Sequence, residues 1–146
     1  MKVCITYHEK FVQYDLGVNH PFRGDRFIKA RSIFDEKGLS QSPNVFYIRP
    51  EPVERMDLLK VHDENYVNLI YRLAEFGRPY NMDTPVSKSI LEALMLIIGG
   101  VTEAGTAIIE GRADRAVALG GGFHHAGRDY GCLLYTSPSP RDRQKS

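Results

Sequence analysis

The sequence predicts an α/β protein in which helices cover both faces of a parallel β-sheet. Three short apolar segments, rich in β-branched residues, have the length and composition of buried strands. Longer segments with apolar residues at helical spacing separate these strands. Strands that alternate with helices form βαβ units, and in sheets of this kind functional sites lie at the carboxyl ends of the strands. Chemistry is therefore expected just past the end of a strand.

The first part of the chain contains two predicted strands with a helix between them. Residues 2–7 form the first strand, and residues 12–24 are predicted to form a loop because they contain Gly, Asn and Pro. Asp25 is the expected N-cap of the helix, and Gly38 stands where a C-cap would. This helix has one apolar stripe, which consists of Phe27, Ile28, Ala30, Ile33 and Phe34. Residues 44–50 form the second strand, which a proline ends.

The next part contains further helices and a third strand. Residues 53–77 are predicted to form two short helices with a break near His62. The longest helix signal covers residues 89–110. The adjacent pair Gly99-Gly100 inside it costs roughly 1 kcal/mol per Gly relative to Ala, so we expect close packing at that point. Residues 114–122 form the third strand, which leads into a glycine loop.

Charge and composition argue against several classes of partner. The chain of 146 residues has 19 basic and 18 acidic side chains and a net charge of +1. Nucleic acid or an anionic membrane is therefore not expected as the main partner. The most apolar segment, residues 90–100, contains Glu92 and is expected to be too short to span a bilayer. With no disulfide framework and no signal-peptide pattern, the sequence predicts a cytoplasmic protein.

Two adjacent histidines, His124 and His125, follow the third strand and three glycines. Neighbouring side chains diverge on a strand or a helix, so the two imidazoles converge only where glycine allows a sharp bend. Imidazoles titrate near neutral pH and suit general acid–base catalysis. Metal ligation and phosphate binding are alternatives, although neither a complete zinc ligand set nor a phosphate-binding motif is present. A turn with two hydrogen-bonded structural histidines explains the same residues.

The segment LGGGFHHAGRDYG, residues 119–131, resembles the tandem-histidine signature of the histone deacetylase family. The bacterial acetoin-utilisation deacetylases and acetylpolyamine amidohydrolases share this signature. Three earlier segments resemble family motifs in the same order: a His-Pro loop at 19–26, a helical segment at 58–70 and a D-x-P loop at 82–86. The resemblance covers residues 1–131 and implies the N-terminal part of a deacetylase domain. The implied fold is arginase/deacetylase-like and truncated.

The resemblance implies a catalytic role for the two histidines. His124 would act as general base or electrostatic partner beside the metal-bound water, and His125 would protonate the leaving amine. The implied reaction is the hydrolysis of an acetyl-amide, in which Zn²⁺ polarises the acetyl carbonyl and activates the water. Acetyl-lysine, an acetylated polyamine or a small acetyl-amide would be the substrate.

Four further residues match family positions. Asp83 would bind substrate at the rim of the site, and Phe123 would shape the acyl channel. Arg26 and Gly121 would line an internal cavity behind the site, where an acetate product could pair with the arginine. A turn residue, a packing residue and a surface charge are the structural alternatives for Asp83, Phe123 and Arg26, in that order. The match at His62 is interpreted as structural, because this residue would cap or join helices.

The zinc ligands of the family, two Asp and one His, follow the histidine pair, and a tyrosine that stabilises the oxyanion comes later still. None of these residues is present in this sequence. The implied Zn²⁺ therefore belongs to an intact parent protein, and this chain is expected to hold no metal and to be inactive. Residues 132–146 are rich in Ser, Pro and Arg and predict a disordered tail. Their first part resembles a translated sequencing-library adapter, so we interpret the tail as an artefact, and a natural basic tail is the alternative.

Two other functions are compatible with the residues. One is a Rossmann-like module that binds a phosphorylated ligand on the glycine loop at residues 120–122. The other is a deacetylase-like interaction protein that keeps the fold without the chemistry. The sequence beyond Gly131 in the parent would distinguish them, because only the enzyme needs the later Asp, His and Tyr residues.

Overall fold

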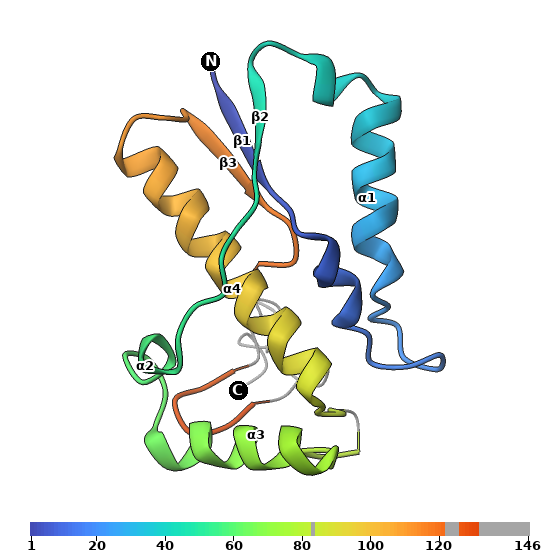
Figure 1. Ribbon diagram of the computed structural model, residues 1–146, viewed down its shortest axis with the longest axis vertical. Helices are drawn as coiled ribbons and strands as arrows, with labels where there is room; N and C mark the ends of the chain where they lie inside the picture. The colour runs from blue at the N-terminus through green and yellow to red at the C-terminus, as the bar shows by residue number, and fades with distance from the viewer. Residues whose placement is uncertain (83, 122–125, 132–146) are drawn as a thin grey trace, which may run out of the picture.

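The computed structural model describes residues 1–82, 84–121 and 126–131, and it contains a parallel sheet, which lies in the upper half of Figure 1. Within these residues the sheet has three strands, β1 (Val3–Thr6), β2 (Val45–Ile48) and β3 (Arg115–Ala118). The helices of the same residues are η1 (Glu9–Gln13), α1 (Asp25–Glu36), η2 (Leu39–Gln41), α2 (Arg55–Leu58), α3 (Glu64–Phe76) and α4 (Lys88–Ile109). The elements η1 and η2 are short 3-10 helices.

The strands lie in the order β2-β1-β3, and both pairs are parallel. Val3 of β1 pairs with Val45 on one side and with Arg115 on the other. The chain passes from β1 through α1 to β2 and then returns through α4 to β3, on the far side of β1. The crossover direction therefore reverses between β1 and β3. Open parallel sheets bind ligands beyond the carboxyl ends of the strands at such a reversal.

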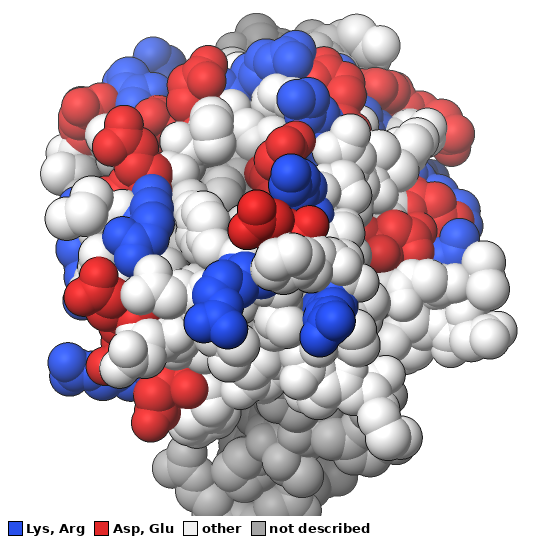
Figure 2. All heavy atoms as spheres, turned by 60° about the horizontal axis from the view of Figure 1, so that its bottom comes forward, with Lys and Arg blue, Asp and Glu red and all other residues white. Residues whose placement is uncertain are grey.

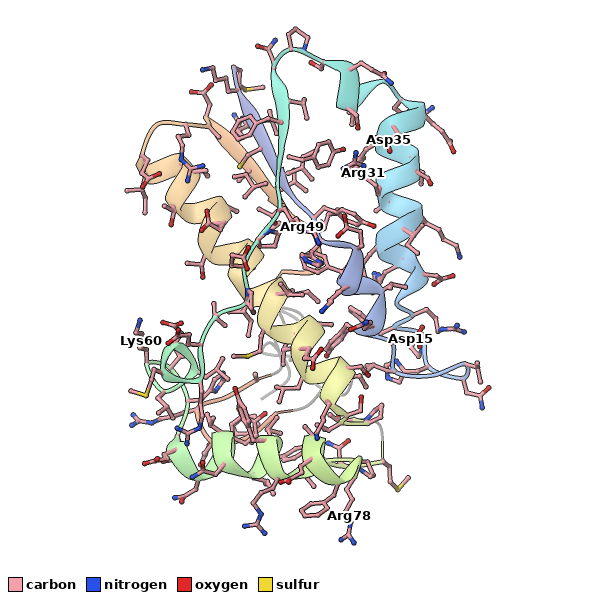
Figure 3. All side chains as sticks on the ribbon, in the orientation of Figure 1. Asp15, Arg31, Asp35, Arg49, Lys60 and Arg78 are labelled. Carbon is pink, nitrogen blue, oxygen red and sulfur yellow. The ribbon has the colours of Figure 1, made fainter. Side chains whose placement is uncertain are left out.

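Helices lie on both faces of this sheet, and the predicted α/β class is confirmed. On one face α4 packs against all three strands, and its Ala107 clusters with Cys4 and Phe46. Successive residues of a strand point to opposite faces, so Tyr47 points away from α4. The centroid of its ring lies 3.7 Å from the guanidinium carbon of Arg31 in α1. Figure 3 shows Arg31 between α1 and β2.

The main hydrophobic core lies where η1, α1 and α4 meet. Phe11 of η1 is fully buried, and its ring centroid lies 5.6 Å from that of Phe27 in α1. Ile97 of α4 belongs to the same cluster. The helix η1 is absent from the predicted elements because five residues are too few to show an apolar period. Its start is fixed by His8, whose Nδ1 accepts a hydrogen bond from the backbone N–H of Lys10 at 3.0 Å.

Helix α1 corrects two expectations. It begins at Asp25 with Gly24 in the N-cap position, so Asp25 is not the N-cap. Of the predicted apolar stripe only Phe27 is buried, whereas Ile28 and Ile33 are 48% and 52% exposed. The physical reason is that α1 reaches the main core through its first turn, which carries Phe27.

The other helices follow the predicted pattern closely. The break near His62 is confirmed, because α2 and α3 lie on either side of this residue. Helix α4 begins and ends within one residue of its predicted bounds. The close packing expected at Gly99 and Gly100 is also confirmed. A Cβ atom at Gly99 would overlap the carbonyl oxygen of Glu51, and one at Gly100 would lie 2.9 Å from the hydroxyl oxygen of Thr6.

Helix α4 also corrects the expectation about membranes. The sequence predicts that the apolar segment at residues 90–100 is too short to span a bilayer. The helix that contains it has 22 residues, and its length and composition would allow it to cross one. In the structure, however, α4 serves as a core helix of this sheet. Its buried residues are Ala93, Met95, Leu96, Ile97, Gly99, Gly100, Ala104 and Ala107. On the face in Figure 2, acidic and basic side chains are interspersed, as a net charge of +1 suggests.

Candidate functional site

The candidate site lies at the carboxyl end of β3, where two glycines enter the loop. Gly120 has a φ of +80°, and a Cβ atom there would lie 2.6 Å from Cε1 of Phe27. A Cβ atom at Gly121 would lie 2.6 Å from Cγ2 of Val101 in α4. The chain therefore leaves β3 between α1 and α4, in a space that no side chain larger than that of glycine fits without movement of its neighbours.

Four of the predicted site residues lie outside the described residues: Asp83, Phe123, His124 and His125. Their assigned roles stay predictions. The structure does describe both flanks of the histidine pair, with Gly121 before it and Ala126 after it. What the structure describes of this region is how the two flanks are held.

Arg26 lies in the first turn of α1, next to the residue that contacts the glycine loop. Its side chain is exposed, and its guanidinium carbon lies 4.3 Å from the centroid of the Phe22 ring, a cation–π contact. The next residue, Phe27, packs against Gly120. The structure therefore brings the first turn of α1 to the glycine loop, and the cavity roles of Arg26 and Gly121 stay predictions.

Asp15 is a residue of this region that the sequence reasoning missed. Its carboxylate accepts hydrogen bonds from the backbone N–H groups of Gly17 at 2.8 Å and Gly24 at 3.0 Å, and from Nε of Arg23 at 3.2 Å. These bonds, the one from Gly17 above all, lower the pKa of Asp15. Asp15 thereby ties the loop to the start of α1, as Figure 3 shows. The Asp-x-Gly spacing, typical of an Asx turn, could have indicated the bond to Gly17 but not the bond to Gly24.

A short turn, residues 126–131, follows the histidine pair and docks on the start of α3. The Nδ1 atom of His62 lies 2.9 Å from the carbonyl oxygen of Gly127. The backbone N–H of Asp63 donates a hydrogen bond to the carbonyl oxygen of Arg128 at 2.7 Å. The structural role expected for His62 thus includes a contact with the loop that carries the predicted catalytic pair.

A groove of about 630 Å³ lies beside this turn. Its walls are mainly apolar side chains of α3 and α4, and His62, Tyr66 and Gly131 also line it. Burial, with a smaller contribution from Tyr80, raises the pKa of Tyr66 to about 12. Burial also raises the pKa of Tyr14, which lies in the same groove. Both phenols are therefore neutral hydrogen-bond donors at physiological pH.

Among the residues that the structure describes, no three His, Cys, Asp or Glu side chains gather into a possible metal site. A catalytic zinc needs three protein ligands. The described part of the chain therefore does not fit the zinc that the resemblance implies, and no chemical step is derived through it.

Comparison with known proteins identifies the family. The family model described as "Histone deacetylase domain" matches residues 20–132. A probable deacetylase of Archaeoglobus fulgidus is 24% identical over 82% of this chain and 33% of its own length. The acetoin utilization protein AcuC of Bacillus subtilis is 28% identical over 88% of this chain and 36% of its own. The histone deacetylase RPD3 of Saccharomyces cerevisiae is 27% identical over 86% of this chain and 31% of its own length.

A solved structure shares the fold. The crystal structure of the HDA15 HD domain superposes with a TM-score of 0.79 at 19% identity, over 90% of this chain and 39% of that one. The chain spans about a third of the length of the curated relatives above. The match to the domain family covers most of the chain, including the glycine loop and the histidine pair. The chain therefore belongs to the histone deacetylase family.

Proposed function

We propose that residues 1–131 form the N-terminal part of a deacetylase that hydrolyses acetyl-amides, with His124 and His125 as its proton carriers. One observation carries this proposal. In the sequence the histidine pair follows Gly121, which the structure places at the carboxyl end of β3, and precedes a turn that is docked on α3. Parallel α/β sheets bind ligands at this end of their strands. Gly121 and the turn at residues 126–131 are both packed against helices, which supports a role for the segment between them that depends on positioning.

In this proposal the two histidines divide the proton transfers. His124 accepts a proton from the attacking water or stabilises the charge beside it, and His125 donates one to the leaving amine. Asp83 holds the substrate at the rim, and Phe123 shapes the acyl channel. Arg26 and Gly121 line the internal cavity. Acetyl-lysine, acetylated polyamines and small acetyl-amides are the candidate substrates, and the cytoplasm is the proposed location.

The family resemblance also implies a zinc ion in the complete protein. When bound, such an ion would polarise the acetyl carbonyl and activate water. We place its ligands beyond Gly131, because the described residues contain no suitable cluster. Family membership argues against the Rossmann-like phosphate-binding alternative. The non-catalytic interaction protein is the competing function that an activity measurement must test.

The test is turnover of a fluorogenic acetyl-lysine peptide by the full-length protein that contains residues 1–131. His125→Ala is expected to lower kcat by about 10²–10⁴-fold, the usual contribution of a positioned proton carrier. His20→Asn is the matched control, because asparagine can still accept the hydrogen bond that Nδ1 of His20 receives from the backbone N–H of Phe22. Near-normal turnover in a folded His125→Ala protein would overturn the catalytic assignment. A folded wild-type protein without turnover would favour the interaction protein.

A further inference from the structure

The turn after the histidine pair, residues 126–131, is closed by its own backbone. The N–H of Gly127 donates a hydrogen bond to the carbonyl oxygen of Tyr130 at 2.8 Å. Ala126 and Gly131 face each other as an antiparallel bridge. A turn closed in this way moves as one unit. Whatever fixes this unit also fixes Ala126, the residue that directly follows His125 in the chain.

Three contacts fix the turn to the start of α3. His62 contacts the carbonyl oxygen of Gly127 through Nδ1, and the backbone of Asp63 bonds the next carbonyl along the turn. The third contact is steric, because a Cβ atom at Gly131 would overlap the hydroxyl oxygen of Tyr66. The ring centroids of His62 and Tyr66 are themselves 5.5 Å apart. The turn is therefore seated against one rigid surface.

That surface is itself well fixed. Asp63 is the N-cap of α3, and its carboxylate accepts a hydrogen bond from the backbone N–H of Asn65 at 2.8 Å. Tyr66 packs on Tyr80, with ring centroids 5.9 Å apart. His62 is the member of this set whose bond to the turn can be removed by substitution without a change to the backbone. A carbonyl oxygen only accepts hydrogen bonds, so Nδ1 of His62 carries the proton in this contact.

We propose that His62 is a positioning residue for the histidine pair and acts through its hydrogen bond to Gly127. This inference rests on the proposed function, because it gives His62 a role in the chemistry assigned to His125. Loss of the donor leaves the Gly127 carbonyl without this partner and frees the turn to shift. Misplacement of a reacting group by about 1 Å can cost on the order of 10²-fold in rate. Substrate contacts are untouched, so kcat falls while KM stays constant.

Two substitutions separate the hydrogen bond from the packing of the ring. His62→Phe keeps an aromatic ring against Tyr66 but has no donor. His62→Asn loses the ring but places an amide N–H near the position of Nδ1. In the full-length protein, His62→Phe is expected to lower kcat by about 10–100-fold with KM unchanged, and His62→Asn to recover most of that loss.

A second measurement does not depend on activity. In the same proteins, the amide hydrogens of residues 126–131 should exchange faster in His62→Phe and at the wild-type rate in His62→Asn. The imidazole signals of His124 and His125 in nuclear magnetic resonance spectra should move in His62→Phe. The signals of His8 and His20, which lie on other elements, should stay in place.

The outcomes separate the two proposals. A wild-type protein that is folded but inactive ends the proposed function, and the exchange and imidazole signals then decide alone whether His62 places the pair. Normal kcat in His62→Phe, or equal losses in His62→Phe and His62→Asn, would overturn the positioning role. So would imidazole signals of the pair that do not respond to the loss of the donor.

Discussion

Asp15 orders a loop that has no regular secondary structure of its own. Its two carboxylate oxygens accept hydrogen bonds from two backbone N–H groups and one arginine side chain. One of these N–H groups belongs to Gly24, the N-cap residue of α1. The carboxylate thus bonds, from nine residues away, the N-cap N–H group that the N3 side chain of a capping box would otherwise bond. This bond connects one acidic residue to the placement of Arg26 two residues later.

We predict that Asp15→Asn lowers the free energy of unfolding by about 1 kcal/mol near neutral pH. Asparagine keeps only one acceptor oxygen, so part of the donor set loses its partner. Loss of a hydrogen-bond partner by a buried group usually costs about 1–3 kcal/mol, and we expect the low end of that range because the Asp15 side chain is 32% exposed. Urea unfolding followed by circular dichroism gives the difference. An equal effect from Asp129→Asn, a change at an exposed aspartate elsewhere, would argue against a special role for Asp15.

The stability difference between the wild type and Asp15→Asn is expected to depend on pH. The pKa of Asp15 is lowered below its ordinary value of 3.8 in the folded state. Stabilisation by its carboxylate is therefore fully present above the unfolded-state pKa and is lost as the pH falls through the folded-state pKa. The stability difference between wild type and Asp15→Asn should be constant from about pH 5 to pH 8 and should shrink below about pH 4.

Helix α4 contacts the sheet, the hydrophobic core and the glycine loop. Gly99 and Gly105 lie on it in different surroundings. A Cβ atom at Gly99 would overlap the backbone oxygen of Glu51, whereas one at Gly105 would meet nothing within 4 Å. The same substitution at the two sites therefore separates close approach from helix propensity.

Gly99→Ala is expected to destabilise the fold by about 1–3 kcal/mol, because the atom it must displace belongs to the backbone. Gly105→Ala is expected to stabilise it by up to about 1 kcal/mol, because alanine is the better helix former. Urea unfolding midpoints of the two variants measure both effects. Two changes of the same sign would contradict the packing assigned to Gly99.

The elements show where sequence reasoning works. Helix α4 and the break between α2 and α3 follow from long apolar periods and local breakers, which are properties of neighbouring residues. The start of α1 does not, because Asp15 bonds Gly24 across the loop and no local pattern reveals that contact. The exposure of Ile28 and Ile33 in the α1 stripe was also not predictable, because it too depends on contacts between distant segments. A period indicates that a helix can bury one face, whereas burial depends on which elements pack there, and here only the first turn reaches the core.

At the scale of the whole molecule, the candidate site combines three distant segments. The glycine loop follows β3, its packing partner Phe27 belongs to α1, and its docking surface is the start of α3. Sequence motifs identify the glycine loop and the histidine pair, because these residues are contiguous. The contact between His62 and Gly127 spans 65 residues, so only the folded chain brings it into view.

The sheet is incompletely covered in this chain. All four residues of β2 are only partly buried, and Val117 of β3 is 40% exposed. β2 and β3 are the two edges of the described sheet. Edge strands with exposed apolar residues promote association between chains. We therefore expect the chain of residues 1–146 to need a fusion partner for good soluble yield.

The last prediction concerns the metal and the activity of residues 1–146. This chain should neither bind Zn²⁺ with micromolar or tighter affinity nor hydrolyse an acetyl-lysine peptide. A catalytic zinc needs three protein ligands, and the part of the chain that the structure describes gathers no such set. Two adjacent histidines supply at most two ligands, and in the proposed function they carry protons instead. Isothermal titration with Zn²⁺ and a fluorogenic deacetylase assay on the purified chain test both statements, with the full-length protein as the positive control. Stoichiometric zinc binding together with turnover would show that residues 1–146 suffice for the chemistry, and would overturn the placement of the zinc ligands beyond Gly131.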